Sequence, residues 1–132
     1  MGTYDFSVSD VIPASSDAIY DAWLSSDEHS AMTGGLAEID PQVGGRYSAW
    51  DGYIEGETLE LEPKRRIVQS WRTSNFTEEH ADSQIEVVLE RADGGTRVTV
   101  NHTTVPDTQR GYQDGGWQKS YFDPMREYFA AR

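Results

Sequence analysis

The chain has 132 residues, a length that suits one domain with a single core, and we expect that domain to span residues 1–132. Its formal net charge is −12, with 23 acidic residues against 11 basic ones. Such a surface repels phosphate backbones and anionic lipids, so we expect neither nucleic acid nor a membrane among its partners. The absence of cysteine excludes a disulfide framework and cysteine-ligated metal.

The start of the chain predicts a strand followed by two short helices. Residues 4–12 alternate between apolar and polar side chains, which indicates a half-buried strand that Pro13 ends. Apolar residues then recur at helical spacing over 16–25, and a shorter helical turn continues to about residue 32. The first residues do not resemble a signal peptide, and no run of about eighteen apolar residues occurs, so we expect a cytoplasmic protein.

Six further strand signals follow, each bounded by glycine, proline or an Asp-Gly pair. Because the turns between them are short, neighbouring strands should pair antiparallel in sequence order. The segments are 36–40, 43–50, 53–62, 66–72, 83–92 and 96–103.

The segment 110–129 contains six aromatic side chains and predicts the last helix. On a helical wheel Trp117, Tyr121 and Met125 share one face. Pro124 lies within this helix, where it removes a backbone donor and should bend the axis. An apolar sheet face needs a covering layer, which predicts an α+β fold. We expect a curved antiparallel sheet of about six to seven strands wrapped round this long helix.

Two glycine pairs stand at the ends of predicted helices. Gly34 and Gly35 either gate the mouth of a cavity through hinge motion or simply connect the short helices to the sheet. Gly115 and Gly116 precede the last helix, and we expect them to let it approach the sheet closely.

Alternation along the strands places a set of side chains toward the last helix. These side chains either fill a packed core or line a cavity large enough for a small apolar ligand. The candidate cavity residues are Tyr47, Ile54, Gln69, Trp71, Val87, Val100, His102, Trp117, Tyr121 and Met125.

Gln69 and His102 are polar at positions that their neighbours mark as inward-facing. Three interpretations are open: they orient the polar end of a ligand, with His102 as an acid or base; they form satisfied hydrogen bonds within the core; or the strand register differs by one and they face water.

Other chemistry has little support in the sequence. His29, His80 and His102 lack companions at metal-ligand spacing, so we expect neither a metal nor another cofactor. No phosphate loop, dinucleotide fingerprint or nucleophile elbow occurs, which predicts a protein without catalytic activity.

Four segments together resemble a known family: "MTGGLAEID", "VGGRYSAWDGYIEGETLELEPKRRIVQSWR", "GGTRVTVNHTTVP" and "GGWQKSYFDPMREYF". In this order they are similar to the C-terminal domain of the activator of the ninety-kilodalton heat-shock protein ATPase, within the START-like (SRPBCC) superfamily. The resemblance implies a helix-grip fold. In eukaryotic members the stimulating activity needs a separate N-terminal domain with a basic, aromatic motif, which residues 1–132 do not contain.

Three functions therefore stand as hypotheses. The first is a non-enzymatic domain that binds a small apolar ligand between sheet and C-terminal helix. The second, which the resemblance implies, is a co-chaperone-like domain that docks on a ninety-kilodalton heat-shock chaperone. The third is an enzyme of the cyclase or hydrolase kind, for which His102 is the candidate catalyst.

Overall fold

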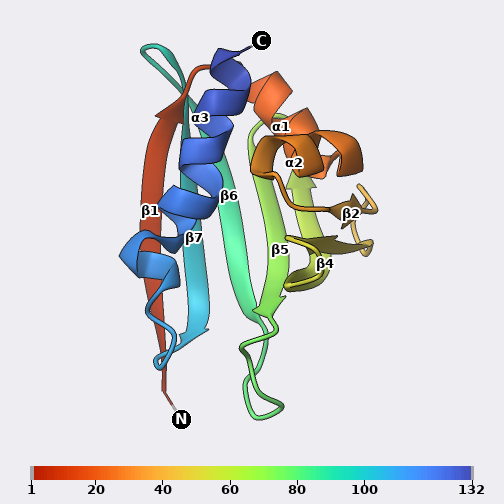
Figure 1. Ribbon diagram of the computed structural model, residues 1–132, viewed down its shortest axis with the longest axis vertical. Coiled ribbons are helices and arrows are strands. Elements are labelled where there is room, and N and C mark those ends of the chain that lie inside the picture. Colours follow the sequence, from red (N-terminus) through yellow and green to blue (C-terminus); the bar gives the residue numbers. More distant parts are fainter. Residues whose placement is uncertain (1, 132) are drawn as a thin grey trace.

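The computed structural model describes residues 2–131, and it confirms the predicted α+β class (Figure 1). Residues 1 and 132 of the expected domain lie outside the described residues. Seven antiparallel strands within this part of the chain form one sheet in the order β1-β7-β6-β5-β4-β3-β2. The strands are β1 (Thr3–Ile12), β2 (Glu38–Ile39), β3 (Arg46–Ala49), β4 (Ile54–Glu62), β5 (Arg66–Thr73), β6 (Ser83–Ala92) and β7 (Gly95–Pro106).

The strand predicted over 36–40 is wrong in length, because only Glu38 and Ile39 pair with β3. The reason lies in helix α2 (Ser26–Thr33), whose serines take the neighbouring backbone groups. Ser30 Oγ accepts a hydrogen bond from the Ala37 amide at 2.8 Å, and Ser26 Oγ accepts one from the Ile39 amide at 2.8 Å. These side-chain bonds fasten the segment to α2 rather than to another strand.

The two short helices occur where the sequence predicts them, because serines and a glycine cap them. Ser15 accepts a hydrogen bond from the Ala18 amide and starts α1 (Ser16–Leu24). Ser25 ends α1 and caps α2 by accepting from the Glu28 amide at 3.2 Å. Gly34 ends α2 in a left-handed conformation, with φ of 88°.

The C-terminal helix is less regular than its aromatic spacing predicts. An irregular turn, η1 (Tyr112–Gly116), leads into a π-helical turn, η2 (Gln118–Phe122), and then into α3 (Asp123–Ala130). In η2 the Asp123 amide donates to the carbonyl of Gln118, five residues earlier. Pro124 follows at once and has no N–H to continue an α-helical ladder. The predicted interruption at Pro124 therefore takes the form of a widened turn before it.

The expected role of Gly115 and Gly116 is wrong. Gly115 has a φ of 109° and open space around it, so it serves the turn rather than a contact with the sheet. A Cβ on Gly116 would come 2.7 Å from the carbonyl oxygen of Gly111, so this glycine permits a tight fold of η1 upon itself.

The helices cover one face of the sheet, with α3 across the β1, β7 and β6 side and α1 and α2 nearer to β4 and β5 (Figure 1). Between these layers lies the core, to which Trp117, Tyr121 and Met125 contribute buried side chains as predicted. Within residues 2–131 none of the helices has both the length and the apolar character to cross a membrane.

Candidate ligand pocket and the buried polar network

A pocket of about 710 Å³ opens between the turn that joins β3 to β4, strand β5 and the segment 108–121. The loop between β5 and β6 reaches the same place through Asn75. Six of the fourteen described lining residues are aromatic: Trp50, Tyr53, Trp71, Tyr112, Trp117 and Tyr121. A volume of this size, with apolar walls and a few polar groups, is typical of small-molecule sites.

The structure separates the ten predicted cavity residues into two groups, although all ten are buried. The first group lines the pocket and consists of Ile54, Trp71, Trp117 and Tyr121. The second group lies outside the pocket lining, in the core between sheet and helix, and consists of Tyr47, Gln69, Val87, Val100, His102 and Met125. The two arrangements that the sequence left open therefore both occur, a packed centre and a pocket at one end. Ligand binding by these residues stays a prediction.

A ring of hydrogen bonds fixes the polar rim of the pocket. Thr73 Oγ1 accepts from the Asn75 amide and donates to Tyr112 Oη, 2.7 Å away. Tyr112 in turn donates to Gln109 Oε1 at 2.7 Å, and Gln109 Nε2 donates to the Asn75 carbonyl at 2.8 Å. Asn75 also donates through Nδ2 to Tyr53 Oη at 2.7 Å. Burial raises the pKa of Tyr112, so its hydroxyl remains protonated and able to donate.

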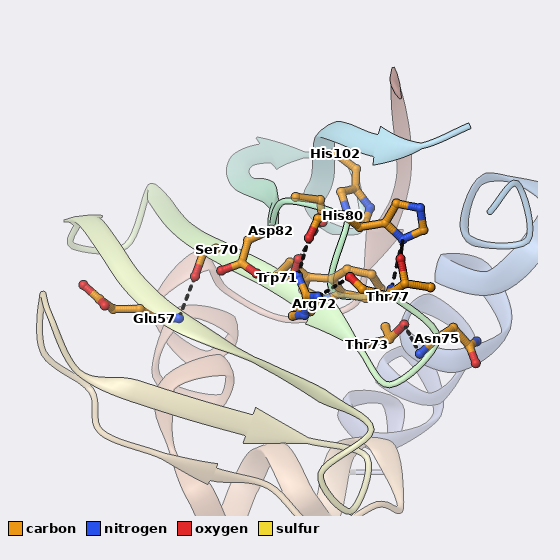
Figure 2. A network of polar contacts seen from close by, with 11 residues as sticks. Glu57, Ser70, Trp71, Arg72, Thr73, Asn75, Thr77, His80, Asp82 and His102 are labelled. Carbon is orange, nitrogen blue, oxygen red and sulfur yellow. Dashed lines mark hydrogen bonds and ion pairs between the residues drawn. The ribbon is translucent and has the colours of Figure 1, made fainter. Parts of the chain in front are cut away.

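Arg72 holds the loop between β5 and β6 in place (Figure 2). Its guanidinium donates to the carbonyls of His80 at 2.7 Å and Thr77 at 2.6 Å, and it pairs with Asp82 at 3.1 Å. His80 Nδ1 accepts from the Thr77 amide within the same loop. Arg72 therefore fixes the position of the loop that contributes Asn75 to the pocket wall.

His102 makes a satisfied hydrogen bond with each ring nitrogen. Trp117 Nε1 donates to His102 Nδ1 at 3.1 Å, which requires that Nδ1 carry no proton. Ser83 Oγ donates to the Trp71 carbonyl at 2.7 Å, so it accepts from His102 Nε2 at 2.9 Å. Burial lowers the pKa of His102 from 6.5 to about 3, so the ring is neutral.

Because both ring nitrogens are engaged and the ring is uncharged, His102 is a core hydrogen-bonding residue. The interpretation in which His102 faces water is wrong, since its exposure is 0%. The enzyme hypothesis loses the residue on which it rested, because His102 has no free nitrogen to offer a substrate. Within residues 2–131, moreover, no cluster of three or more His, Asp or Glu side chains is placed to hold a metal ion.

Gln69 joins α1 to the sheet in the same manner. Its Oε1 accepts from Trp23 Nε1 at 3.1 Å, and its Nε2 donates to Thr58 Oγ1 at 3.2 Å. The side chain is 1% exposed, so this amide is another satisfied core group.

A third buried polar residue, His29, was not identified from sequence as part of the core. Its Nδ1 donates to the Trp23 carbonyl at 2.8 Å, and its Nε2 accepts from the Tyr121 hydroxyl at 3.0 Å. Burial lowers the pKa of His29 and raises that of Tyr121, which keeps both groups neutral. The sequence signal that could have identified His29 as buried is its helical spacing from Met32 and Thr33, which are also buried.

One of the two predicted gate residues, Gly35, lies against a wall of the pocket. A Cβ on Gly35 would come 2.7 Å from the indole of Trp50, and Trp50 lines the pocket. Gly34 provides the left-handed end of α2, as a connector would. Hinge motion at these two glycines stays a prediction. Sequence reasoning did not select Trp50, because the Asp-Gly turn directly after it made it the end of a strand.

These features define a class: an α+β helix-grip domain with a packed centre and a pocket at one end of its long helix. Residues 13–130 match the family described as "Activator of Hsp90 ATPase homolog 1-like protein", and the chain belongs to that family. The predicted family is thereby confirmed.

Named relatives agree with this assignment. The chain is 31% identical over 90 residues to the activator of 90 kDa heat shock protein ATPase homolog 2 of Mus musculus, which covers 68% of this chain and 27% of the relative. It is 25% identical over 115 residues to homolog 1 of Homo sapiens, which covers 87% of this chain and 34% of the relative. The chain thus spans about a third or less of the length of these two relatives.

Solved structures show the same fold. An HSP90 activator from Plasmodium falciparum superposes with a TM-score of 0.84 at 20% identity, over 96% of both chains. CalU16 from Micromonospora echinospora superposes with a TM-score of 0.75 at 22% identity, over 92% of this chain and 73% of CalU16. At these identities the likeness shows the fold alone.

Proposed function

We propose that this domain docks on a ninety-kilodalton heat-shock chaperone. The observation that carries the proposal is the extent of the family match, because residues 13–130 include every described element from α1 to α3. The relatives from mouse and human are both named as activators of the chaperone ATPase. The shared domain is about a third or less of each, so we assign docking to it rather than the full stimulating activity.

Charge supports a particular mode of docking. With a net charge of −12, the domain should be steered toward a basic patch on its partner. Electrostatic attraction between exposed groups is screened within about 10 Å at 0.1 M salt. We therefore expect association that is fastest at low ionic strength and weakens as salt is added.

The test combines direct binding with the ATPase rate of the purified chaperone. Titration of the chain at low salt should give a saturable binding signal and a change in ATPase rate, and both should decline with added salt. An unrelated acidic protein of similar size and charge serves as the control for nonspecific attraction. Flat titrations in both assays at low salt contradict the proposal.

The pocket supports a second function, the binding of a small apolar molecule. The specific observation is the volume of about 710 Å³ behind six aromatic side chains. Three of these six, Trp71, Trp117 and Tyr121, belong to the set predicted from sequence, and the other three, Trp50, Tyr53 and Tyr112, do not. Native mass spectrometry of freshly purified protein would detect a co-purified guest.

A neutral fluorescent probe, N-phenyl-1-naphthylamine, measures capture by the pocket. Trp117→Ala and Tyr121→Ala should weaken probe binding, because both side chains form the wall. Met125→Ala is the matched control, since Met125 is fully buried nearby in the last helix and does not line the pocket. If all three variants lose stability alike and none changes probe affinity, the aromatic residues act as packed core.

A further inference from the structure

Trp50 has an unusual combination of features. It stands at the start of the turn between β3 and β4 with a φ of 52°, a left-handed conformation that bulky residues rarely adopt. It lines the pocket, and its indole Nε1 is buried. Among the described residues, this nitrogen is the one buried side-chain nitrogen or oxygen without a hydrogen-bond partner. An unsatisfied buried donor destabilises a protein, so such a group calls for an explanation.

Neighbouring groups hold Trp50 in this conformation. The Tyr53 amide donates to the Trp50 carbonyl at 3.1 Å and closes the turn. The Asp51 amide donates to the Leu36 carbonyl at 2.9 Å, and the Leu36 amide donates to Asp51 Oδ1 at 3.2 Å. Gly35 lies directly against the indole, where no larger residue fits. Strained backbone that persists because its surroundings fix it is frequent at binding sites.

Three other polar side chains at the pocket already have hydrogen-bond partners within the protein. Asn75, Gln109 and Tyr112 belong to the hydrogen-bonded ring of the rim. The guanidinium of Arg110 lies over the Tyr4 ring, 4.0 Å from its centroid. The pocket therefore combines aromatic walls with a buried donor, Trp50 Nε1, that has no hydrogen-bond partner among the described residues.

We infer that the pocket binds a neutral, planar aromatic molecule with a carbonyl or ether oxygen that accepts a hydrogen bond from Trp50 Nε1; this inference rests on the proposed ligand-binding function. Flat aromatic walls favour stacking with a planar guest. A cation is disfavoured, because Arg110 lines the pocket and none of the described carboxylates does. An anion is disfavoured by the net charge of −12 and by the engagement of Arg110 with Tyr4.

Two probes of nearly the same shape test the role of the acceptor. The first is 2-acetylnaphthalene, which carries a ketone, and the second is 2-isopropylnaphthalene, which does not. Trp50→Phe keeps an aromatic side chain and removes the N–H. We expect this variant to lower the ratio of ketone affinity to hydrocarbon affinity by about tenfold, as the loss of one buried hydrogen bond predicts. Trp23→Phe is the matched control and should keep the wild-type ratio, since Trp23 Nε1 donates to Gln69 and Trp23 does not line the pocket.

Nuclear magnetic resonance of the unsubstituted protein provides a second measurement that does not depend on how a variant folds. The chain has four tryptophans, and the indole signal absent from Trp50→Phe belongs to Trp50. The ketone should move that signal downfield, and the hydrocarbon should not. Binding of both probes with an unchanged ratio in Trp50→Phe and no downfield shift overturns this inference while ligand binding stands. Binding of neither probe overturns the ligand-binding function and this inference with it.

Discussion

Tyr121 donates its phenolic hydrogen to Nε2 of His29 over 3.0 Å, and this contact joins the π-helical turn η2 to α2. Trp23 completes the arrangement, since its carbonyl accepts from His29 Nδ1 and its ring lies 5.1 Å from that of Tyr121. One buried imidazole thereby links three helical segments on the covered face of the sheet.

Tyr121→Phe should therefore destabilise the fold by about 1–3 kcal/mol, because it leaves His29 Nε2 buried without a donor. Urea denaturation measures the effect. The matched control is Tyr128→Phe, whose half-buried hydroxyl donates to Glu28 at 3.0 Å nearer the surface and should matter less. Equal losses of unfolding free energy in the two variants would show that the buried contact with His29 stabilises the fold no more than the contact with Glu28 does.

Stability should fall in acid because of His102. Burial holds its folded-state pKa at about 3, below the ordinary 6.5, so the unfolded chain takes up the proton first as the pH drops. The contribution of His102 is complete above pH 6.5 and is lost as the pH falls from 6.5 toward 3, by about 1.4 kcal/mol per pH unit.

The variant His102→Gln isolates this contribution, since glutamine does not titrate. Its unfolding free energy should depend less steeply on pH between 6.5 and 5 than that of the wild type. Val100→Ala, two positions away on β7 and equally buried, should lower stability by the same amount at both pH values. If the unfolding free energy of His102→Gln depends on pH as steeply as that of the wild type, the pKa of His102 is not lowered in the folded protein.

Gln69 offers a test of the buried amide. Gln69→Glu places a carboxylate at a site 1% exposed and removes the donor to Thr58, which should destabilise the protein by about 3 kcal/mol or more. Gln84→Glu makes the same chemical change at an exposed position of β6 and should have a small effect. Thermal unfolding of the pair compares the two sites directly.

Two glycines of the segment before η2 differ in backbone conformation alone. Both Gly111 and Gly115 have open space where a Cβ would stand, but Gly115 has a φ of 109° and Gly111 one of −61°. Gly115→Ala should destabilise by about 1–2 kcal/mol through left-handed strain. Gly111→Ala should be neutral or stabilise by about 0.4–1 kcal/mol, because it restricts the unfolded chain. Chemical denaturation distinguishes the two outcomes by sign.

The strands and their buried faces could be predicted from sequence because alternation with a period of two marks a half-buried strand directly. Tyr47, Gln69 and His102 all face inward as the pattern indicates. The length of β2 could not be predicted, because the side chains of Ser26 and Ser30 decide it from another element. The same limitation applies to η2, since aromatic spacing does not distinguish an α-helical turn from a π-helical one.

The pocket was predictable only in part. Alternation identifies which side chains face the helix, but the volume left between layers depends on how those side chains pack. Ile54 and Trp71 therefore line the pocket, while Val87 and Val100 fill the core. Trp50 was not predicted to line the pocket. Its position depends on a left-handed backbone conformation, which a tryptophan in the sequence does not indicate.

The strand order has a consequence for how the chain acquires its structure during synthesis. Among the strands of this domain β1 comes first along the chain, yet its pairing partner within the sheet is β7, with Val8 opposite Val100. The intervening strands can pair with their neighbours as they are synthesised, whereas β1 cannot pair until nearly the whole domain has been made. The entropic cost of closing so long a loop slows the pairing of β1 with β7. Until that pairing forms, the unpaired strand can associate with other chains. The strand that comes first in the domain is therefore among the last to pair.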